Sequence, residues 1–229
     1  MTTGRQRVYV YVDGFNLYYG SLQATPFRWL DLGELCKRLF PTDTVALIRY
    51  YTADVPALPE DPAAAYRQRE YLRALATIPN LTIKRGFFRV RPKRQQRVLP
   101  LYAPNPHLPN PSNEYVAVWR KEEKGSDVNL ATDLLMDAAV PRFDAAWVIS
   151  NDADLAWPIE RVRLDYKLPV GVFKPARPAG YPGENRPDSP QLLTAATEFR
   201  RLKARHLVGC MFPSEMHDAY GPIRKPAGW

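Results

Sequence analysis

The chain has 229 residues, of which 45% are hydrophobic and 24% are charged, a balance that excludes fibrous and intrinsically disordered classes. Its formal net charge of +8 favours polyanionic partners such as nucleic acid, nucleotides or an anionic membrane, and the alternative is that the charge only keeps the protein in solution. Two distant cysteines, Cys36 and Cys210, make no CxxC pair, which favours a reduced cytoplasmic protein over a secreted one. The short N-terminal apolar run predicts no signal peptide, and no stretch approaches the ~18 apolar residues of a membrane span.

Strand and helix patterns alternate along the first ninety residues. Residues 8–12 (VYVYV) are uncharged strand formers, which predicts a buried central strand. The spacing at 30–40 predicts a helix that Asp31 caps and Pro41 ends. The pattern then predicts a strand at 44–52, a helix at 63–78 and a strand at 81–90.

The second half resumes this alternation after a different kind of segment. Residues 91–120 are basic and rich in proline, which predicts an insertion with a hairpin around 97–120. Residues 206–212 are predicted to be a last strand or a tail, and the final residues to be unstructured. The elements predicted between these segments are a helix at 125–140, a strand with an acidic tip at 145–155, a helix at 158–165, a strand at 168–175 and a helix at 191–205.

Alternating strands and helices predict an α/β fold, with a mostly parallel sheet covered by helices on both faces. We expect a single domain over 1–210 and a C-terminal tail over 211–229. In such folds ligands bind beyond the carboxyl ends of the strands, so acidic side chains at strand ends are candidate site residues.

Acidic residues lie at two predicted strand ends and at one predicted helix start. Asp13 follows the first strand directly, Asp152 and Asp154 follow the strand that begins at residue 145, and Asp127 opens a helix. Each has a simpler interpretation taken alone: a turn residue, helix caps, and a charge that favours a helix N-terminus, where Ser126 would be the cap. Together they predict a carboxylate cluster, which needs cations to offset its repulsion, and oxygen ligands select Mg²⁺ or Mn²⁺.

Helical periodicity separates the acids of residues 125–140. At 100° per residue, Asp127 falls within the arc of the apolar stripe and is predicted to point toward the sheet. Asp133 and Asp137 fall on the opposite flank, so we expect them off the cleft and Asp137 in solvent.

Cations and aromatic residues alternate along 85–97, around Phe87 and Phe88. This pattern suits single-stranded nucleic acid, through phosphate contacts and base stacking. The alternative is that the phenylalanines belong to the core and the arginines to a solvated face. The tryptophans Trp119, Trp147 and Trp157 are expected to pack. Candidate phosphate contacts are Arg85, Arg89, Lys121, Lys124, Arg161 and Lys174.

Three motifs in this order resemble the NYN domain, a branch of the PIN-like nuclease fold. They are DGFN at 13–16, KGSDVNLATDLL at 124–135 and SNDADL at 150–155, and the resemblance spans about residues 6–205. The chain looks most similar to the bacterial LabA-like members. The resemblance implies a PIN-like Rossmannoid three-layer sandwich and a metal-dependent endoribonuclease that uses Mg²⁺ or Mn²⁺ to activate water against RNA.

The resemblance also implies roles for individual residues. Asp13, Asp127 and Asp152 would be the metal-site carboxylates, with Asp154 as a fourth acid. Asn16 would orient a phosphate or a water, and Ser150 would hydrogen-bond within the strand-end loop. The chain departs from the family pattern at Asn151, where glycine is frequent, and at Leu155, where phenylalanine is frequent.

Two other functions stay open on the sequence. A non-catalytic RNA-binding or regulatory module would keep the same fold, and a homo-oligomer is compatible with either function. A phosphatase of the haloacid-dehalogenase type needs a second carboxylate two residues after the first, where this chain has Phe15.

Overall fold

One seven-stranded sheet organises the chain in the computed structural model, which describes residues 5–57, 61–96, 115–140 and 142–229. The strand order is β4-β3-β2-β1-β5-β6-β7, and every neighbouring pair is parallel except β3 with β4. The strands are β1 (Arg7–Asp13), β2 (Thr44–Ala53), β3 (Leu81–Gln96), β4 (Tyr115–Lys124), β5 (Ala145–Ile149), β6 (Val170–Pro175) and β7 (Glu198–Leu202).

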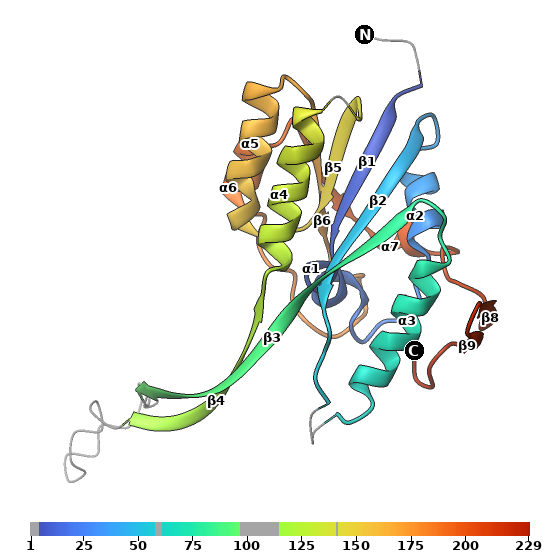
Figure 1. The fold of residues 1–229 in the computed structure, drawn as a ribbon, viewed down its shortest axis with the longest axis vertical. Coiled ribbons are helices and arrows are strands. Elements are labelled where there is room, and N and C mark those ends of the chain that lie inside the picture. Colours follow the sequence, from blue (N-terminus) through green and yellow to red (C-terminus); the bar gives the residue numbers. More distant parts are fainter. Residues whose placement is uncertain (1–4, 58–60, 97–114, 141) are drawn as a thin grey trace.

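Helices cover both faces of the sheet (Figure 1). One face carries α4 (Ser126–Ala139), α5 (Ala156–Asp165) and α6 (Pro190–Ala195), and the other carries α2 (Leu32–Leu39), α3 (Ala64–Ala76) and α7 (Ala204–Leu207). Short helical turns follow two strands at their carboxyl ends: α1 (Gly14–Leu17) with η1 (Tyr18–Leu22) after β1, and η3 (Ala153–Leu155) after β5. The predicted three-layer α/β fold is therefore confirmed.

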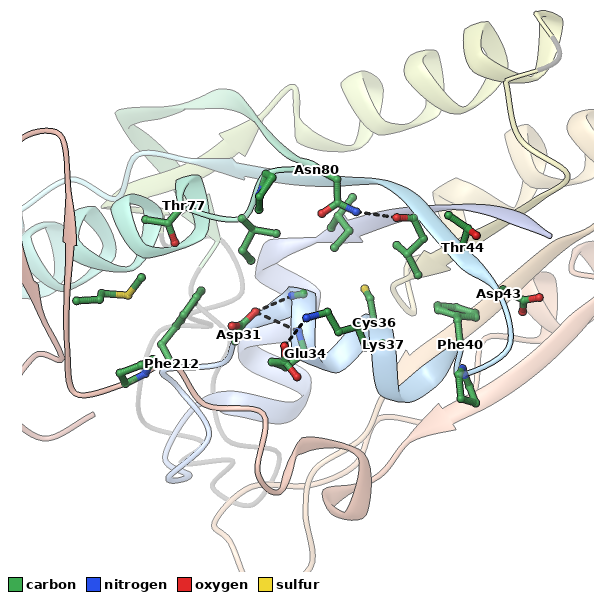
Figure 2. Close-up of a pocket in the computed structure, with 18 of the residues that line it drawn as sticks. Asp31, Glu34, Cys36, Lys37, Phe40, Asp43, Thr44, Thr77, Asn80 and Phe212 are labelled. Atoms are coloured by element: carbon green, nitrogen blue, oxygen red, sulfur yellow. Dashed lines mark hydrogen bonds and ion pairs between the residues drawn. The ribbon is translucent and has the colours of Figure 1, made fainter. Parts of the chain in front are cut away.

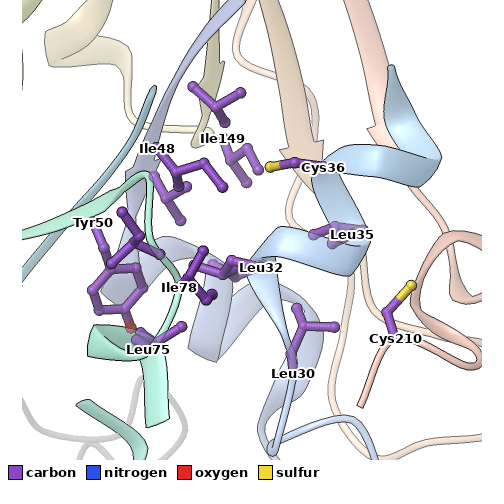
Figure 3. Packing of buried hydrophobic residues seen from close by; sticks show 14 of the residues in the cluster. Leu30, Leu32, Leu35, Cys36, Ile48, Tyr50, Leu75, Ile78, Ile149 and Cys210 are labelled. Carbon is purple, nitrogen blue, oxygen red and sulfur yellow. The ribbon is translucent and has the colours of Figure 1, made fainter. Parts of the chain in front are cut away.

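The central strand β1 is apolar because its side chains pack into hydrophobic cores on both faces of the sheet. Val10 and Val12 belong to the core beneath α2 and α3, whereas Tyr11 belongs to the core beneath α4 and α5. Figure 3 shows part of the first core, where Leu32 and Cys36 of α2 lie near Ile48 of β2. A strand buried on both faces has no solvent side for polar residues, which explains the uncharged run that the sequence shows.

The prediction of one continuous helix over 191–205 is wrong. Helix α6 ends at Ala195, and Glu198–Leu202 instead forms β7, which pairs in parallel with β6. Leu202 is fully buried while Arg200 and Arg201 are exposed, so pairing with the sheet overrides the weak helical preference of the segment.

The C-terminal residues predicted to be unstructured are also ordered. They form a separate hairpin of β8 (Glu215–Asp218) and β9 (Gly221–Arg224). Ile223 is fully buried in the core under α3, and the Trp229 ring lies 5.8 Å from that of Tyr71. The C-terminal hairpin and Trp229 therefore pack against the helical layer that contains α2 and α3.

Strands β3 and β4 extend beyond the sheet as a two-stranded ribbon (Figure 1). The strand predicted to end at residue 90 continues to Gln96, and it pairs with β4 from Phe87 onward. Gly86 lies where the ribbon leaves the sheet, and a Cβ there would come within 2.3 Å of the Lys124 carbonyl oxygen. The predicted proline-rich insertion falls partly on this ribbon, and its residues 97–114 lie outside the described residues.

The opposite end of the sheet holds a cavity of about 530 Å³ beside Thr44 and Asn80 (Figure 2). Asp31 lies there as the N-cap of α2, accepting hydrogen bonds from the backbone N–H groups of Gly33 and Glu34, which confirms the predicted cap. None of the candidate site residues lines this cavity. Within the described ranges, no helix is long and apolar enough to cross a membrane.

Candidate active site

Asp13 ends β1 as a buried carboxylate that is 3% exposed. Its Oδ1 accepts a hydrogen bond from the Asn16 backbone N–H at 2.9 Å, and its Oδ2 accepts from Asn16 Nδ2 at 2.8 Å. Ser150 Oγ donates a third hydrogen bond to Oδ2 at 2.9 Å. Burial raises the pKa of Asp13 despite these donors, and the nearby charge of Asp152 raises it further. Asp13 thus caps α1, as the turn interpretation requires, and its burial also makes the charged form of the carboxyl group less favourable.

The end of β5 is tied to this carboxylate through Ser150, which is fully buried. Ser150 Oγ accepts from the Asp152 backbone N–H at 3.0 Å, and Asp152 Oδ1 accepts from the Asp154 N–H at 3.0 Å. Asn16 Oδ1 accepts from the Asn151 N–H at 3.3 Å. Because β1 and β5 pair in parallel register, the DGFN and SNDADL segments meet at one sheet edge.

Asp127, in the first turn of α4, lies within the field of these acids. Burial and then the charges of Asp13, Asp152, Glu123 and Asp154 raise the pKa of Asp127 to about 7. After burial, the charges that raise this pKa most are those of the four neighbouring carboxylates. The structure therefore brings the predicted acids of all three motifs into one electrostatic group.

Glu123 joins this group, although it was not among the residues predicted from the sequence. The Ser126 hydroxyl donates to Glu123 Oε1 at 2.5 Å, and the Ser126 N–H donates to the same oxygen at 3.1 Å. Gly125, with φ of 97°, precedes the helix, so Ser126 is a helical residue and not the expected cap. An acid three residues before a helix start was the signal available for Glu123.

The donor set suits a hard divalent cation, but not as a closed protein cage. Among the described residues, no three Asp, Glu, His or Cys side chains are arranged to hold one ion together. Mg²⁺ is commonly bound through one or two carboxylates, with waters and substrate phosphate completing its shell. Asp127 could be such a ligand, because it is half-buried, and burial and the neighbouring carboxylates both disfavour its charged form until a cation offsets the charge.

The other acids of α4 form a separate network. Asp133 accepts from the Tyr51 hydroxyl at 2.9 Å and from Arg49 at 3.4 Å, off the cleft as predicted. The prediction that Asp137 is solvated is wrong, because it is 2% exposed and accepts from the Tyr11 hydroxyl and from Arg49, both at 2.9 Å. The sheet supplies these donors, which periodicity within α4 alone does not show.

The candidate phosphate contacts differ in accessibility. Arg85 pairs with Asp54, Lys124 pairs with Glu122, and Arg161 lies over the Trp157 ring, while Arg89 and Lys121 are exposed on the ribbon. Lys174 is 4% exposed, and its ammonium donates to Asp188 Oδ1 at 2.7 Å. Lys174 is therefore a buried structural cation and is not free to contact substrate.

The expectation that three tryptophans pack holds for Trp147, which is 9% exposed. It is wrong for Trp119 and Trp157, which are 76% and 66% exposed. Trp119 lies on the two-stranded ribbon, where no helix layer covers it (Figure 1). Exposed tryptophan of this kind is available to a ligand.

Comparison with solved structures shows the fold. A protein of unknown function from Vibrio parahaemolyticus matches with a TM-score of 0.50 and 15% identity, over 89% of this chain and 97% of that one. In sequence, the chain is 28% identical to 6-hydroxy-3-succinoylpyridine 3-monooxygenase HspA of Pseudomonas putida, over 97% of this chain and 75% of that protein.

The family model described as the NYN domain matches residues 7–202, which include all three acidic motifs. The matched range begins with β1 and ends with β7, so it contains the whole seven-stranded sheet. The chain belongs to the NYN domain family and has its nuclease-like fold.

Proposed function

We propose that this protein is a metal-dependent endoribonuclease that works with Mg²⁺ or Mn²⁺. The observation that carries the proposal is an acidic group in which Asp13, Asp152 and Asp154 follow the carboxyl ends of β1 and β5, and Asp127 joins them from the first turn of α4. This is the edge at which open α/β sheets bind ligands. The chain as a whole has a net charge of +8, which favours a polyanionic substrate, and a phosphate of that substrate can bind the cation at the acidic cluster.

Each residue of the site has a definite part in this proposal. Asp13, Asp127 and Asp152 would be the metal-site carboxylates, of which one or two would contact a given cation while waters and substrate phosphate complete its shell, and Asp154 would be the fourth acid. A bound divalent cation supplies the positive charge that offsets these carboxylates, activates water and stabilises the leaving oxygen. Ser150 and the Asn16 amide hold Asp13 in place, and the Asn16 side chain also fixes the backbone at Asn151. These contacts set the site before substrate arrives.

The ribbon offers a path for single-stranded RNA to this site. Register places Phe88, Lys121, Trp119, Arg94 and Tyr115 on one face of β3–β4, together with Glu123 at its base. Lys121 lies 4.9 Å from the centre of the Phe88 ring, and Phe88 packs edge-on at 5.5 Å against Phe15, beside Asp13. Alternating aromatic and cationic side chains bind bases and phosphates without sequence preference.

The test is cleavage of a labelled RNA oligonucleotide in Mg²⁺, in Mn²⁺ and in excess EDTA, with a DNA oligonucleotide alongside. We expect cleavage that EDTA stops and that Asp13→Asn abolishes. Asp165→Asn is the matched control, because Asp165 is an exposed acid on α5 outside the cluster. Undiminished cleavage by a folded Asp13→Asn variant would falsify the proposal.

The alternative functions give different results in the same assay series. RNA binding in EDTA without cleavage in Mg²⁺ or Mn²⁺ would favour a non-catalytic RNA-binding module. Hydrolysis of a generic phosphate monoester in preference to RNA would favour a phosphatase.

A monooxygenase is the second candidate, because the relative that bears that name aligns with 97% of this chain. A cavity of about 190 Å³ next to Gly14 is walled by Phe15, Tyr18, Tyr50 and Tyr71, and would accept a flat aromatic ring. Oxygen uptake that depends on 6-hydroxy-3-succinoylpyridine and an added electron donor would support this second candidate over the nuclease.

A further inference from the structure

A small cavity lies beside the acidic cluster. Its volume is about 170 Å³, and it is bounded by Asn16, Asn151, Asn185 and Arg186, with the rings of Phe15 and Tyr19. Glu184 also lines it. Asn16 connects this cavity to the proposed catalytic site, because its side chain bonds Asp13 on one side and the Asn151 backbone on the other.

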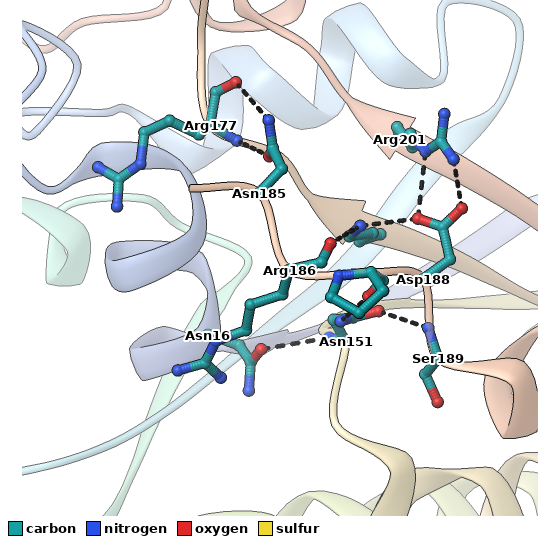
Figure 4. A network of polar contacts seen from close by, with 10 residues as sticks. Asn16, Asn151, Arg177, Asn185, Arg186, Asp188, Ser189 and Arg201 are labelled. Carbon is teal, nitrogen blue, oxygen red and sulfur yellow. Dashed lines mark hydrogen bonds and ion pairs between the residues drawn. The ribbon is translucent and has the colours of Figure 1, made fainter. Parts of the chain in front are cut away.

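The chain between β6 and α6 reaches this cavity in a fixed conformation (Figure 4). Buried Lys174 donates to the carbonyl of Arg186 and to Asp188, and Arg201 donates to the same Asp188 carboxylate. Hydrogen bonds from Arg201 and then Lys174 hold the pKa of Asp188 at about 2, so this junction stays charged at neutral pH.

Asn151 fixes the other side of the same loop. Its Nδ2 donates to the Pro187 carbonyl at 3.0 Å, and its Oδ1 accepts from the Ser189 N–H at 3.1 Å. Asn185 Oδ1 accepts from the Arg177 N–H at 2.6 Å. The backbone is therefore held at each position around Arg186. Asn151 stands where the family often has glycine, and only a side chain makes these two contacts.

The Arg186 side chain is left available by this arrangement. Residue 186 is exposed, and none of the ion pairs between described residues uses its guanidinium. Figure 4 shows the side chain running from the fixed loop toward Asn16. The neighbouring Arg177 differs, because its guanidinium donates to the carbonyls of Tyr19 and Gln23.

We propose that Arg186 binds a phosphate of the RNA next to the one held at the acidic cluster. A planar guanidinium matches two phosphate oxygens, which makes arginine the usual choice for such a contact. A cation is needed here because the carboxylates repel a polyanion wherever a metal ion does not offset them. The fixed loop reduces the entropy lost when Arg186 engages.

This inference rests on the proposed function for the identity of the polyanion, and binding tests it without cleavage. We would measure affinity for a single-stranded RNA oligonucleotide by fluorescence anisotropy in EDTA, over a range of salt concentrations. Arg186→Ala should weaken binding on the order of tenfold, and should reduce the slope of log affinity against log salt by about 0.7.

Two further variants test whether the effect of Arg186 comes from its charge or from its guanidinium geometry, and whether removal of any exposed arginine has the same effect. Arg186→Lys should restore the salt slope but not the full affinity, because it lacks the bidentate fork. Arg224→Ala, which removes an exposed arginine of the C-terminal hairpin, should match wild type. In Mg²⁺, Arg186→Ala should raise KM for RNA more than it lowers kcat.

The outcomes distinguish this inference from the proposed function. Wild-type affinity and salt slope in Arg186→Ala, or no RNA binding by the wild-type chain, would overturn the Arg186 assignment. Binding that depends on Arg186 in a chain that never cleaves RNA would sustain it and refute the nuclease.

Discussion

The Ser150 hydroxyl donates a 2.9 Å hydrogen bond to Oδ2 of Asp13 and so joins the carboxyl ends of β1 and β5. Both side chains are almost fully buried. The same hydroxyl accepts from the Asp152 backbone N–H, so one serine orients two of the three proposed metal-site acids. Outer contacts of this kind set the position of metal-binding carboxylates.

Ser150→Ala should therefore reduce cleavage strongly and reduce the stability of the fold only moderately. We expect metal-dependent cleavage to fall about 10- to 100-fold, with the Mg²⁺ concentration for half-maximal rate rising, because Asp13 loses one of its donors. The free energy of unfolding should fall by about 1–3 kcal/mol. The measurements are a Mg²⁺ titration of rate and a urea denaturation curve.

Ser21→Ala is the matched control for that variant. Ser21 is also fully buried, but its hydroxyl donates to the Ala176 carbonyl and contacts none of the acids. It should lose stability with an unchanged Mg²⁺ requirement. Equal Mg²⁺ requirements in the two variants would show that Ser150 has no special role at the site.

Stability should depend on pH through Asp127. Its pKa is about 7 in the folded chain, well above its ordinary value of 3.8, because of burial and the surrounding carboxylates. The folded state therefore holds this proton more tightly than the unfolded state, and stability falls as pH rises from about 4 to 7. In EDTA, the thermal midpoint should decrease between pH 5 and pH 8.

Divalent cations should oppose that decrease, because they bind the ionised carboxylates and displace protons. Added Mg²⁺ should raise the thermal midpoint more at pH 8 than at pH 5. Asp127→Asn should flatten the pH dependence in EDTA. A pH dependence that is the same in Asp127→Asn and wild type would contradict this account.

Trp119→Ala tests whether the ribbon carries RNA. Its side chain is 76% exposed, so removal should leave the thermal midpoint unchanged. RNA affinity should weaken by about 1–3 kcal/mol, the range for loss of one base stack. Tyr220→Ala is the comparison, since Tyr220 is 90% exposed on the separate C-terminal hairpin. Equal affinities for the two variants in anisotropy titrations would rule out the ribbon as a binding surface.

Short-range patterns in the sequence predicted much of this arrangement. The uncharged run 8–12 predicted the central strand, Asp31 predicted the start of α2, and the acids that end β1 and β5 lie at the predicted edge of the sheet. These features are set within a few residues by hydrogen bonding and burial, so the local sequence contains them.

Features that depend on distant partners were not predictable in the same way. Asp137 is buried because Tyr11 and Arg49 of the sheet bind it. Arg186 faces the site because Lys174 and Asn151 fix its loop. Only the folded chain brings these partners together, and no periodicity within one segment reveals them.

Asp137→Asn tests the buried network directly. The change leaves Arg49, which is mostly buried, without its closest carboxylate, and breaking such a pair costs about 3–5 kcal/mol. Asp133→Asn should cost less, because Asp133 is more exposed and lies 3.4 Å from Arg49. Urea denaturation of both variants gives the comparison. Asp137→Asn with wild-type stability would mean that the network does not support the fold.

Ile223→Ala tests whether the C-terminal hairpin is part of the core. Ile223 is fully buried with residues of the α2 and α3 layer, and Arg73 of α3 pairs with Asp218 at 2.7 Å. Removal of buried methyl groups should lower the free energy of unfolding by about 2–5 kcal/mol. Val208→Ala, at a position that is 56% exposed, should change it by less than about 0.5 kcal/mol. If the two variants unfold at the same urea concentration, the hairpin does not contribute to the stability of the core.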